Sequence, residues 1–492
     1  MIQNKTKKKV NKSKIRSIEK SKKIKKIKKL KKIIDLNKLK QKKNKRDKKE
    51  KKETNSKSYD VIVVGGGIAG LYTAYNLLKK HNTKNINNNN TKNNKNNLKL
   101  LLVESNDYLG GRIYTNEEHN YETGAARFHD KQKRMIKLIK ELNLEEHMVP
   151  ISSKIKFMPY PSNRYMNINY FDKVVNINTI IDEIIELKNE NIISYNEMIN
   201  NSLLDLIDKK LDKKYPNIKK TLEEIYEYWS EISIMNSYDA LKLFKNDFDT
   251  NKQFYVLNNG LNQIIKTLEK HIRDYGGIIK KNTFIESIDK NEHLYILNNK
   301  YNCKKLILAL PKHNLLKFAI LNNDKTTKSL LNSVEESPLY RIYAKYPTNI
   351  LNTYCWFHKL PKITTNLKIK YIIPINYQNG LIMISYTDGK HSKYWINKYL
   401  DENKIDEEIH KQLHKLFPTY EIPKPEWTKH HYWNAGAAYW KIGSESSKLI
   451  HKIIKPLNKE NIFICGENYS NHQAWIEGAL QTSDLVLKKI KI

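Results

Sequence analysis

Two apolar runs near the beginning of the chain are each followed by residues that end a strand. Residues 61–64, Val-Ile-Val-Val, lead into a glycine turn, and residues 101–103, Leu-Leu-Val, lead into Glu104. A short apolar run between turn signals is typical of a buried strand. We expect a helix to lead away from the turn, so the pattern predicts a strand, a tight turn, a helix and a second strand.

Later segments have other periods. Residues 131–147 and 178–245 repeat apolar positions at helical spacing. The part from Leu339 to Tyr386 contains apolar runs between loop signals, which predicts strands, and together these parts favour a mixed sheet with helices on one side. Residues 81–97 are almost wholly Asn, Lys and Thr. We expect a disordered surface insertion there, because such a segment has too little apolar surface to offset its ordering entropy.

The turn after the first strand has the spacing GxGxxG, formed by Gly65, Gly67 and Gly70. In a dinucleotide fold the first glycine permits the tight turn, the second lets the backbone approach a pyrophosphate, and the third lets the helix pack closely on the strand. The helix N-terminus then faces the phosphates, and Glu104 can accept from ribose hydroxyls. The acid lies 34 residues beyond Gly70 instead of about 20, and the predicted insertion accounts for the excess.

Positive charge is concentrated at the N-terminus. Residues 1–58 contain 27 Lys and Arg against 5 acids, and the 492-residue chain has a net charge of +37. Residues 1–57 contain no aromatic residue, Gly or Pro, so we expect a disordered basic tail without a core. The tail could be a basic arm that binds nucleic acid or an anionic surface, or that serves nuclear import. Alternatively, it is a solvated segment that reflects the chain's general bias towards Lys, Asn and Ile.

Cysteine and hydropathy patterns bear on the compartment. Cys303, Cys355 and Cys465 lie far apart and match no disulfide or metal spacing, which favours a reducing compartment. We expect no metal site, because isolated surface histidines are far commoner than histidine ligands. No segment reaches the roughly 18 apolar residues of a membrane span, and the N-terminus lacks the apolar region of a signal peptide. We therefore expect an intracellular, soluble protein, either cytoplasmic or nuclear.

A second glycine pair follows Glu104. Gly110, Gly111 and Arg112 place a fixed cation just past the acid, which suits the long, doubly charged pyrophosphate of FAD. At this point the chain resembles the flavin-containing amine oxidase family, which includes monoamine, polyamine and L-amino-acid oxidases. Further matching blocks are Gly124-Ala125-Ala126-Arg127-Phe128, Asn259-Gly260-Leu261, Ile307-Leu308-Ala309-Leu310-Pro311, Ile464-Cys465-Gly466-Glu467 and Trp475-Ile476-Glu477-Gly478-Ala479.

The resemblance implies an α/β fold in which a Rossmann-type FAD-binding domain is interleaved with an α+β substrate domain. Nucleotide-binding signals fall in three pieces of chain, so we expect the FAD-binding domain to comprise residues 58–130, 255–312 and 458–492. Residues 131–254 and 313–457 then form the substrate domain. The residues expected to contact FAD are Gly65, Gly67, Ile68, Ala69, Gly70, Glu104, Gly111, Arg112, Ala126, Arg127, Ile285, Trp433, Gly466, Glu467, Trp475 and Ile476.

The resemblance also assigns the reacting end of the site. Tyr439 and Trp475 would flank the substrate amine as aromatic walls, unless both are core residues. In monoamine oxidases the residue before the matched tyrosine is a cysteine bonded to FAD, whereas here it is Ala438, so non-covalent FAD is expected. The lysine that holds a water at flavin N5 in polyamine oxidases is matched by Arg341, or by Lys345 if the register slips.

Two residues bear on specificity. Arg127 resembles the arginine with which L-amino-acid oxidases grip the substrate carboxylate, and Tyr386 resembles the tyrosine that completes that clamp. Arg127 could instead be structural and pair with Glu122 or a flavin phosphate. The implied reaction is hydride transfer from the Cα–H of an amine or L-amino acid to flavin N5, hydrolysis of the imine, and reduction of oxygen to hydrogen peroxide. The alternatives are a desaturase-like flavin oxidoreductase on the same scaffold, or a flavoprotein docked to nucleic acid with secondary catalysis.

Deletion of residues 1–57 tests the role of the tail. We expect the truncated protein to fold and to keep its turnover, because the deleted residues carry charge but no core. Its retention on heparin should fall and become less sensitive to salt, since fewer cations remain to displace counterions. Chromatography at several salt concentrations measures this change. A truncated protein that is unfolded or free of flavin would place the boundary elsewhere.

Overall fold

The computed structural model describes residues 57–87, 97–161, 177–226, 228–248, 252–349, 355–399, 401–458 and 460–492. The expected basic tail, apart from Lys57, and residues 88–96 of the expected insertion lie outside the described residues. Residues 58–492 form one unit, and all elements below belong to it except for Lys57 at the start of the first strand.

The first sheet contains the predicted glycine turn. Its strands run in the order β10-β11-β12-β1-β2-β9, and β18 pairs with β12. The bounds are β1 Lys57–Val64, β2 Leu100–Val103, β9 Ile278–Lys280, β10 Ile288–Asn291, β11 Leu294–Leu297, β12 Tyr301–Leu308 and β18 Ile462–Ile464. The strands β1, β2 and β9 are parallel to one another, as β12 is to β18. This arrangement confirms the predicted Rossmann-type α/β fold.

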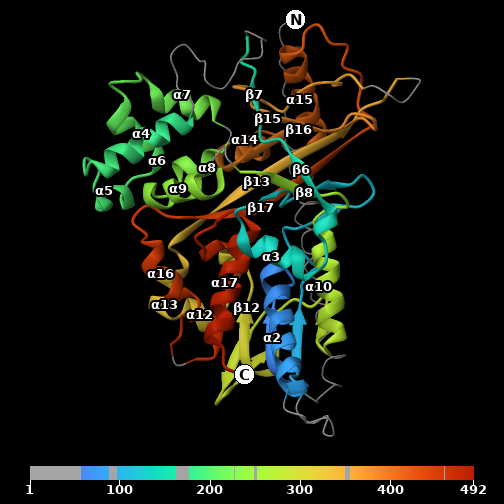
Figure 1. Ribbon diagram of the computed structural model, residues 1–492, viewed down its shortest axis with the longest axis vertical. Coiled ribbons are helices and arrows are strands. Elements are labelled where there is room, and N and C mark those ends of the chain that lie inside the picture. The colour runs from blue at the N-terminus through green and yellow to red at the C-terminus, as the bar shows by residue number, and fades with distance from the viewer. Residues whose placement is uncertain are drawn as a thin grey trace, which may run out of the picture. The chain divides into compact units, whose positions relative to one another are not determined.

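Three helices lie side by side along the first sheet. They are α2 (Ile68–Asn87), α10 (Asn262–Asp274) and α17 (Ile476–Lys489), and Figure 1 shows α2 between the other two. Because α2 continues to Asn87, residues 81–87 are helical, and the prediction that they belong to a disordered insertion is wrong. Polar residues of this kind prolong an existing helix at little cost, since propagation adds a hydrogen bond for each residue fixed.

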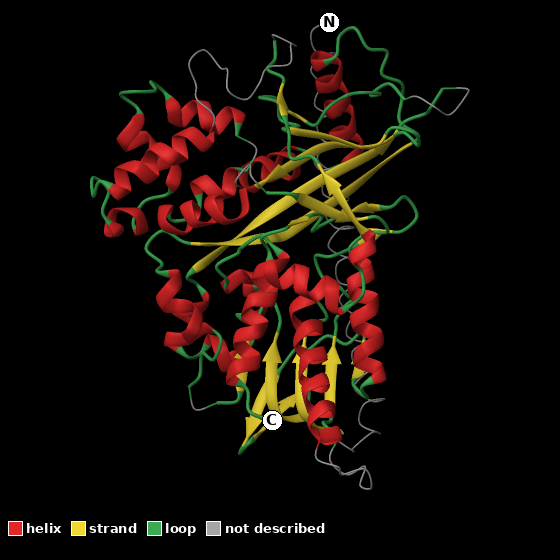
Figure 2. Cartoon of the chain, viewed as in Figure 1, coloured by secondary structure: helices red, strands yellow, loops and turns green. Residues whose placement is uncertain are grey.

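The second sheet contains the longest strands and lies apart from the first, as the yellow arrows of Figure 2 show. Its order is β17-β13-β16-β15-β14-β7. The bounds are β17 Trp427–Trp440, β13 Val334–Lys345, β16 Leu381–Asp388, β15 Tyr371–Asn376, β14 Ile363–Thr364 and β7 Lys156–Phe157. The neighbours are antiparallel except for β14 and β7, so the sheet is mixed, as predicted.

Helices occupy the segments in which helical spacing was found. They are α3 Lys133–Glu141, α4 Ile177–Asn189, α5 Tyr195–Ile199, α6 Leu203–Leu211, α7 Ile218–Ile225, α8 Trp229–Ser233 and α9 Ser237–Leu243, followed by the π-helical turn η3 Phe244–Phe248. Ser194, Ser202 and Asn236 cap α5, α6 and α9, because each side chain accepts from the backbone N–H three residues on.

The remaining elements are short or peripheral. The helices are α11 Lys312–Leu315, α12 Ala319–Asn322, α13 Lys325–Leu331, α14 Gly389–Lys398, α15 Glu402–Leu416 and α16 Ser446–Ile453, with 3-10 turns η2 Glu145–His147 and η4 Glu467–Tyr469. Two small sheets pair β3 Thr115–Asn116 with β4 Tyr121–Glu122, and β8 Phe254–Leu257 with β5 Phe128–His129 and β6 Met148–Ile151. Within the described ranges, no helix is long and apolar enough to cross a bilayer.

Two glycines set how closely α2 approaches β1. Gly65 has φ +107°, a conformation that residues with a side chain rarely adopt. A Cβ on Gly70 would lie 2.0 Å from the Gly65 carbonyl oxygen, which is backbone and cannot move aside. A Cβ on Gly67 would meet nothing nearer than 3.8 Å. The third glycine of the motif is therefore needed for packing, whereas the protein itself leaves room beside the second.

Alanine substitutions at these glycines should separate the two roles. We expect Gly70→Ala to lower the free energy of unfolding by about 1–3 kcal/mol or more, the range for overpacking against an unyielding neighbour. Gly67→Ala should change stability by less than about 0.5 kcal/mol, as at a site with open space. Chemical denaturation of the cofactor-free proteins measures both. Equal destabilisation by the two substitutions would contradict this reading of the turn.

Candidate functional site

A cavity of about 970 Å³ is lined by residues of both large sheets. Most of the predicted site residues line it, namely Gly65, Gly67, Ile68, Ala69, Glu104, Gly111, Arg112, Ala126, Arg127, Arg341, Tyr386, Trp433, Tyr439, Gly466, Glu467, Trp475 and Ile476. Ile285 lines a smaller cavity of about 270 Å³, which shares Gly65 and Glu104 with the first. Gly70 is packed against the Gly65 carbonyl, so its contribution is structural.

The glycine turn leaves an open approach to the first turn of α2. The nearest atom to a Cβ on Gly67 would be the Gly110 carbonyl oxygen, so the space beside Gly67 belongs to the cavity. The first turn of α2 carries no acid, and the N–H groups of a helix N-terminus favour an anion. Glu104 is held beside it, because its carboxylate accepts from Gly66 N at 2.7 Å and from Asn106 N at 2.9 Å.

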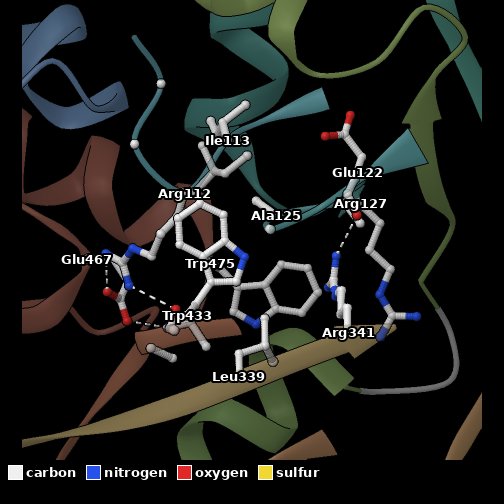
Figure 3. Close-up of a pocket in the computed structure, with 18 of the residues that line it drawn as sticks. Arg112, Ile113, Glu122, Ala125, Arg127, Leu339, Arg341, Trp433, Glu467 and Trp475 are labelled. Carbon is white, nitrogen blue, oxygen red and sulfur yellow. Dashed lines mark hydrogen bonds and ion pairs between the residues drawn. The ribbon is translucent and has the colours of Figure 1, made fainter. Parts of the chain in front are cut away.

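Arg112 is held by Glu467. Its Nη2 lies 2.8 Å from Glu467 Oε2, and its Nη1 donates to the Gly436 carbonyl at 3.0 Å. The other carboxylate oxygen, Oε1, accepts from the backbone N–H groups of Ala438 and Ala474 at 3.0 and 2.9 Å. Figure 3 shows the ion pair on one side of two indole rings, with two further arginines on the other side. One buried carboxylate therefore links three separate segments at the cavity wall.

Trp433, Trp475 and Tyr439 are among the aromatic side chains that line the cavity. Trp433 Nε1 donates to a backbone carbonyl at 2.8 Å. Trp475 packs edge-on against His129, with ring centroids 5.6 Å apart. Tyr439 is buried, its hydroxyl donates to Glu231 Oε1 at 2.9 Å, and burial raises its pKa well above the usual range. Tyr439 and Trp475 both contribute to the cavity wall, and their place on either side of a substrate amine stays a prediction.

Of two neighbouring alanines on β17, Ala437 lines the cavity and Ala438 does not. Ala438 is fully buried and its N–H donates to Glu467, whereas Ala437 and Tyr439 line the cavity. The position matched to the flavin-bonding cysteine is therefore an alanine outside the cavity lining. The chain's three cysteines are buried, and none of them lines either cavity.

Arg341 is the cation of β13 that lines the cavity. Its Nη1 donates to the Glu122 carbonyl at 3.2 Å, and its guanidinium lies 5.2 Å from the centre of the Tyr386 ring. Lys345, which a slipped register would select, pairs with Glu426 at 2.6 Å and is not part of the cavity lining. Of the two candidates, Arg341 is therefore the residue placed to reach a bound ligand.

Arg127 lies among aromatic rings. Its Nη2 donates to the Tyr228 hydroxyl at 3.2 Å, and its guanidinium lies 4.7 Å from the centre of the Phe254 ring. The ring of Tyr386 packs edge-on against that of Tyr228 at 6.1 Å. Within the described part of the chain, Arg127 forms no ion pair, so the pairing with Glu122 that we considered does not occur.

Glu122 has other partners, which explains this difference. Its Oε1 accepts from Leu261 N at 2.6 Å and from Thr115 Oγ1 at 3.0 Å. Burial raises the pKa of the Glu122 carboxyl to about 7, although both hydrogen bonds and the charge of Arg341 oppose this shift. One oxygen of the Glu122 carboxyl is thus held by the β3–β4 turn and by the start of α10.

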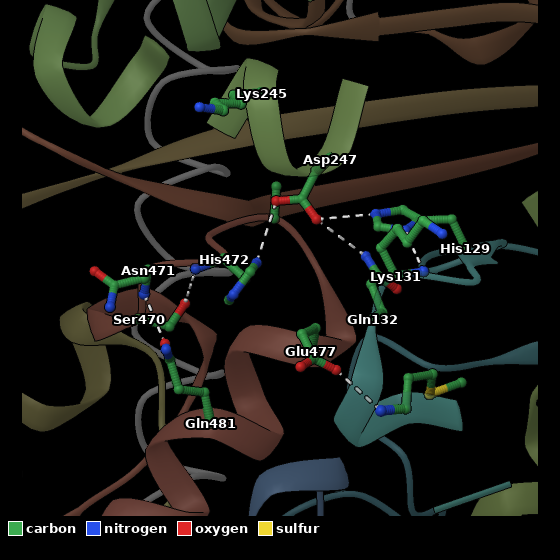
Figure 4. Close-up of polar contacts among 12 residues, drawn as sticks. His129, Lys131, Gln132, Lys245, Asp247, Ser470, Asn471, His472, Glu477 and Gln481 are labelled. Atoms are coloured by element: carbon green, nitrogen blue, oxygen red, sulfur yellow. Dashed lines mark hydrogen bonds and ion pairs between the residues drawn. The ribbon is translucent and has the colours of Figure 1, made fainter. Parts of the chain in front are cut away.

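A buried cluster behind Trp475 was not predicted. Asp247 lies 3.1 Å from His129 Nε2 and 3.3 Å from His472 Nδ1, as Figure 4 shows. His129 Nδ1 accepts from Lys131 N at 3.2 Å, so its proton is on Nε2 and is donated to Asp247. The cluster supports Trp475 through His129. Its three members come from distant parts of the sequence, and no local pattern connects them.

Further cavity residues also carried no sequence signal. Asp388, at the end of β16, accepts from Trp229 N at 3.1 Å and from Ser230 N at 2.9 Å, and burial raises its pKa to about 6. Tyr228, which is bonded to Arg127, and Lys362 also line the cavity. Among the described residues, no group of three His, Cys, Asp or Glu is arranged to hold a metal ion.

Comparisons with known proteins identify the fold and the family of the chain. A solved structure of putrescine oxidase bound to putrescine has the same fold, with a TM-score of 0.66, 14% identity, and coverage of 88% of this chain and 98% of that one. An uncharacterized protein of Acanthamoeba polyphaga mimivirus is 22% identical over 89% of this chain and 94% of its own length. Flavin-containing amine oxidase A of Canis lupus familiaris is 25% identical, and the match spans 51% of this chain and half of that protein. The family described as flavin containing amine oxidoreductase matches residues 68–486, and the chain therefore belongs to it.

Proposed function

We propose that the two cavities hold FAD without a covalent bond. Gly67 and the first turn of α2 offer an open approach for a pyrophosphate, and Glu104 is fixed where ribose hydroxyls can donate to it. Ile285 lines the smaller cavity beside Glu104, which suits an adenine ring. The cavity lining contains no cysteine that could bond the flavin. When bound, FAD supplies the acceptor for the hydride.

We propose that the substrate is an L-amino acid, which the enzyme oxidises at Cα to an imine. The observation that carries this proposal is the guanidinium of Arg127, which lines the cavity with a tyrosine hydroxyl and a phenyl ring as its neighbours. A buried cation of this kind is costly unless an anion joins it, and an arginine binds a carboxylate with two parallel hydrogen bonds. The α-carboxylate of an amino acid supplies that anion.

The other cavity residues then have distinct roles. The rings of Tyr439 and Trp475 confine the amine and exclude water, and Tyr386 lies next to the rings that surround Arg127. Arg341 is the candidate to hold a water near the reacting atoms. The imine would be hydrolysed in solution, and oxygen would accept the two electrons to give hydrogen peroxide.

The manner of flavin attachment can be tested directly. We expect the purified protein to be yellow, and precipitation with acid should release all flavin into the supernatant, because no cysteine lines the cavity. Absorbance of the supernatant and the pellet measures the partition. Flavin that stays in the pellet, or a colourless protein that does not take up FAD, would contradict the proposal.

The Arg127→Met substitution tests the substrate class. We expect kcat/KM for L-amino acids to fall by an amount equivalent to about 2 kcal/mol or more, the range for loss of a charge-assisted hydrogen bond. Turnover of the corresponding decarboxylated amine should be nearly unchanged, since it has no group for Arg127 to bind. Peroxide release against both substrate sets measures the difference.

Arg273→Met is the matched control, because Arg273 pairs with Glu269 on the exposed surface of α10. Both variants should retain the flavin content of the wild type. Efficient oxidation of diamines by the wild type, together with no effect of Arg127→Met, would return Arg127 to a structural role. It would also favour the reaction for which the similar putrescine oxidase is named.

A further inference from the structure

A second cation shares the cavity with Arg127. Lys362 is half buried in the cavity wall, and its Nζ donates to the Ser152 carbonyl. In the described chain, neither Lys362 nor Arg127 forms an ion pair with a carboxylate. The two charges interact, because burial and then repulsion by Arg127 lower the pKa of Lys362 to about 8. Near neutral pH both side chains are therefore charged.

The backbone of Lys362 is fixed. The residue directly precedes β14, and Lys156 N donates to the Lys362 carbonyl at 2.9 Å where β7 pairs with β14. Ile373 and Ile375 of β15 line the cavity as well, so part of the wall next to β14 is apolar. Because β14 pairs with β15 on one side and with β7 on the other, its first residues are fixed, and Lys362 is held in the cavity wall.

The other arginines of the cavity lie near acids. Arg112 pairs with Glu467, and the charge of Arg341 acts on the buried Glu122 carboxyl, whose raised pKa it opposes. Arg127 donates to a tyrosine hydroxyl and Lys362 to a backbone carbonyl, and these neutral acceptors do not compensate a charge. The charges of Arg127 and Lys362 thus remain for a ligand to neutralise.

The number of charges defines the ligand. Two like charges that are partly withdrawn from water repel each other, and a single carboxylate leaves one positive charge uncompensated. A ligand with two carboxylates neutralises both. Its α-carboxylate suits the planar fork of an arginine, and a carboxylate on a flexible side chain suits the point charge of a lysine.

We infer that the preferred substrate is an acidic L-amino acid, whose α-carboxylate binds Arg127 and whose side-chain carboxylate binds Lys362. This inference rests on the proposed amino-acid oxidation. It goes beyond that proposal because it assigns specificity for the substrate's side chain to Lys362, the residue that directly precedes β14.

Acidic amino acids and their amides give a test in which size is held nearly constant. The rate of flavin bleaching without oxygen is measured with L-glutamate, L-aspartate, L-glutamine and L-asparagine. We expect the wild type to prefer the acids, and Lys362→Met to reduce kcat/KM for the better acid by about tenfold or more, the scale of a lost charge-assisted hydrogen bond. The amides should change by less than about twofold. Lys362→Arg should retain most of the preference, because it keeps the charge.

Lys368→Met is the matched control. Lys368 is exposed six residues along the same segment and is not part of the cavity lining, so its loss removes an equal charge and should change neither set of substrates. Binding of glutarate and of its monoamide to the wild type, followed by the flavin spectrum, gives a second measurement that does not depend on the stability of any variant. Glutarate should bind more tightly.

Three results would overturn the inference, and each can be distinguished from a result that refutes the proposed function. Equal loss for acids and amides in Lys362→Met would mean that Lys362 serves the α-carboxylate or the fold. A wild-type preference for the amides, or equal binding of glutarate and its monoamide, would remove the second anion site. In all these cases amino-acid oxidation itself stands. Bleaching by diamines and by no amino acid would instead refute the proposed function, and the inference with it.

Discussion

The buried carboxylate of Glu467 is the interaction on which the arrangement of the site depends. It binds the Arg112 guanidinium with one oxygen and the backbone N–H groups of Ala438 and Ala474 with the other. Hydrogen bonds to a charged group contribute about 1.5–3 kcal/mol each, and removing one partner of a buried ion pair costs about 3–5 kcal/mol. Glu467 therefore joins the loop after β2, the strand β17 and the loop before α17 with a strength that no single apolar contact gives.

This constraint couples the two ends of the cavity. Ala438 N is held, so this part of β17 is fixed beside the loop that carries Arg112, and its neighbours Ala437 and Tyr439 line the cavity. Ala474 N is held in the same way, and the next residue is Trp475, whose ring is supported from behind by the His129–Asp247–His472 cluster. The loop that carries Arg112 and the aromatic wall are thus placed by one side chain.

The sequence predicts the strand and the glycine turn well, because backbone constraints between chain neighbours govern them. A Cβ on Gly70 would clash with the Gly65 carbonyl, and residues 61–64 form a buried strand, and local sequence patterns indicate both features. The part of the cavity around Arg127 is different. Asp247 contacts His129 and His472, and Lys362 lines the same cavity as Arg127, across more than a hundred residues in each case. Long-range pairing decides these contacts, and without the fold no pattern in one sequence points to them.

Strands show the same limit of local patterns. On β17, Ala437 lines the cavity and Ala438 is buried beside it, and the motif alone does not say which of the two borders the cavity. A shift of one residue along a strand moves every side chain to the opposite face, so assignments by sequence match are least secure on strands. Arg341 and Lys345 are four positions apart, so their side chains lie on the same face of β13. Their positions along the strand therefore decide which of them lines the cavity. The structure adds two facts that a motif does not contain. It shows which face of a strand each side chain occupies, and how deeply each charged group is buried.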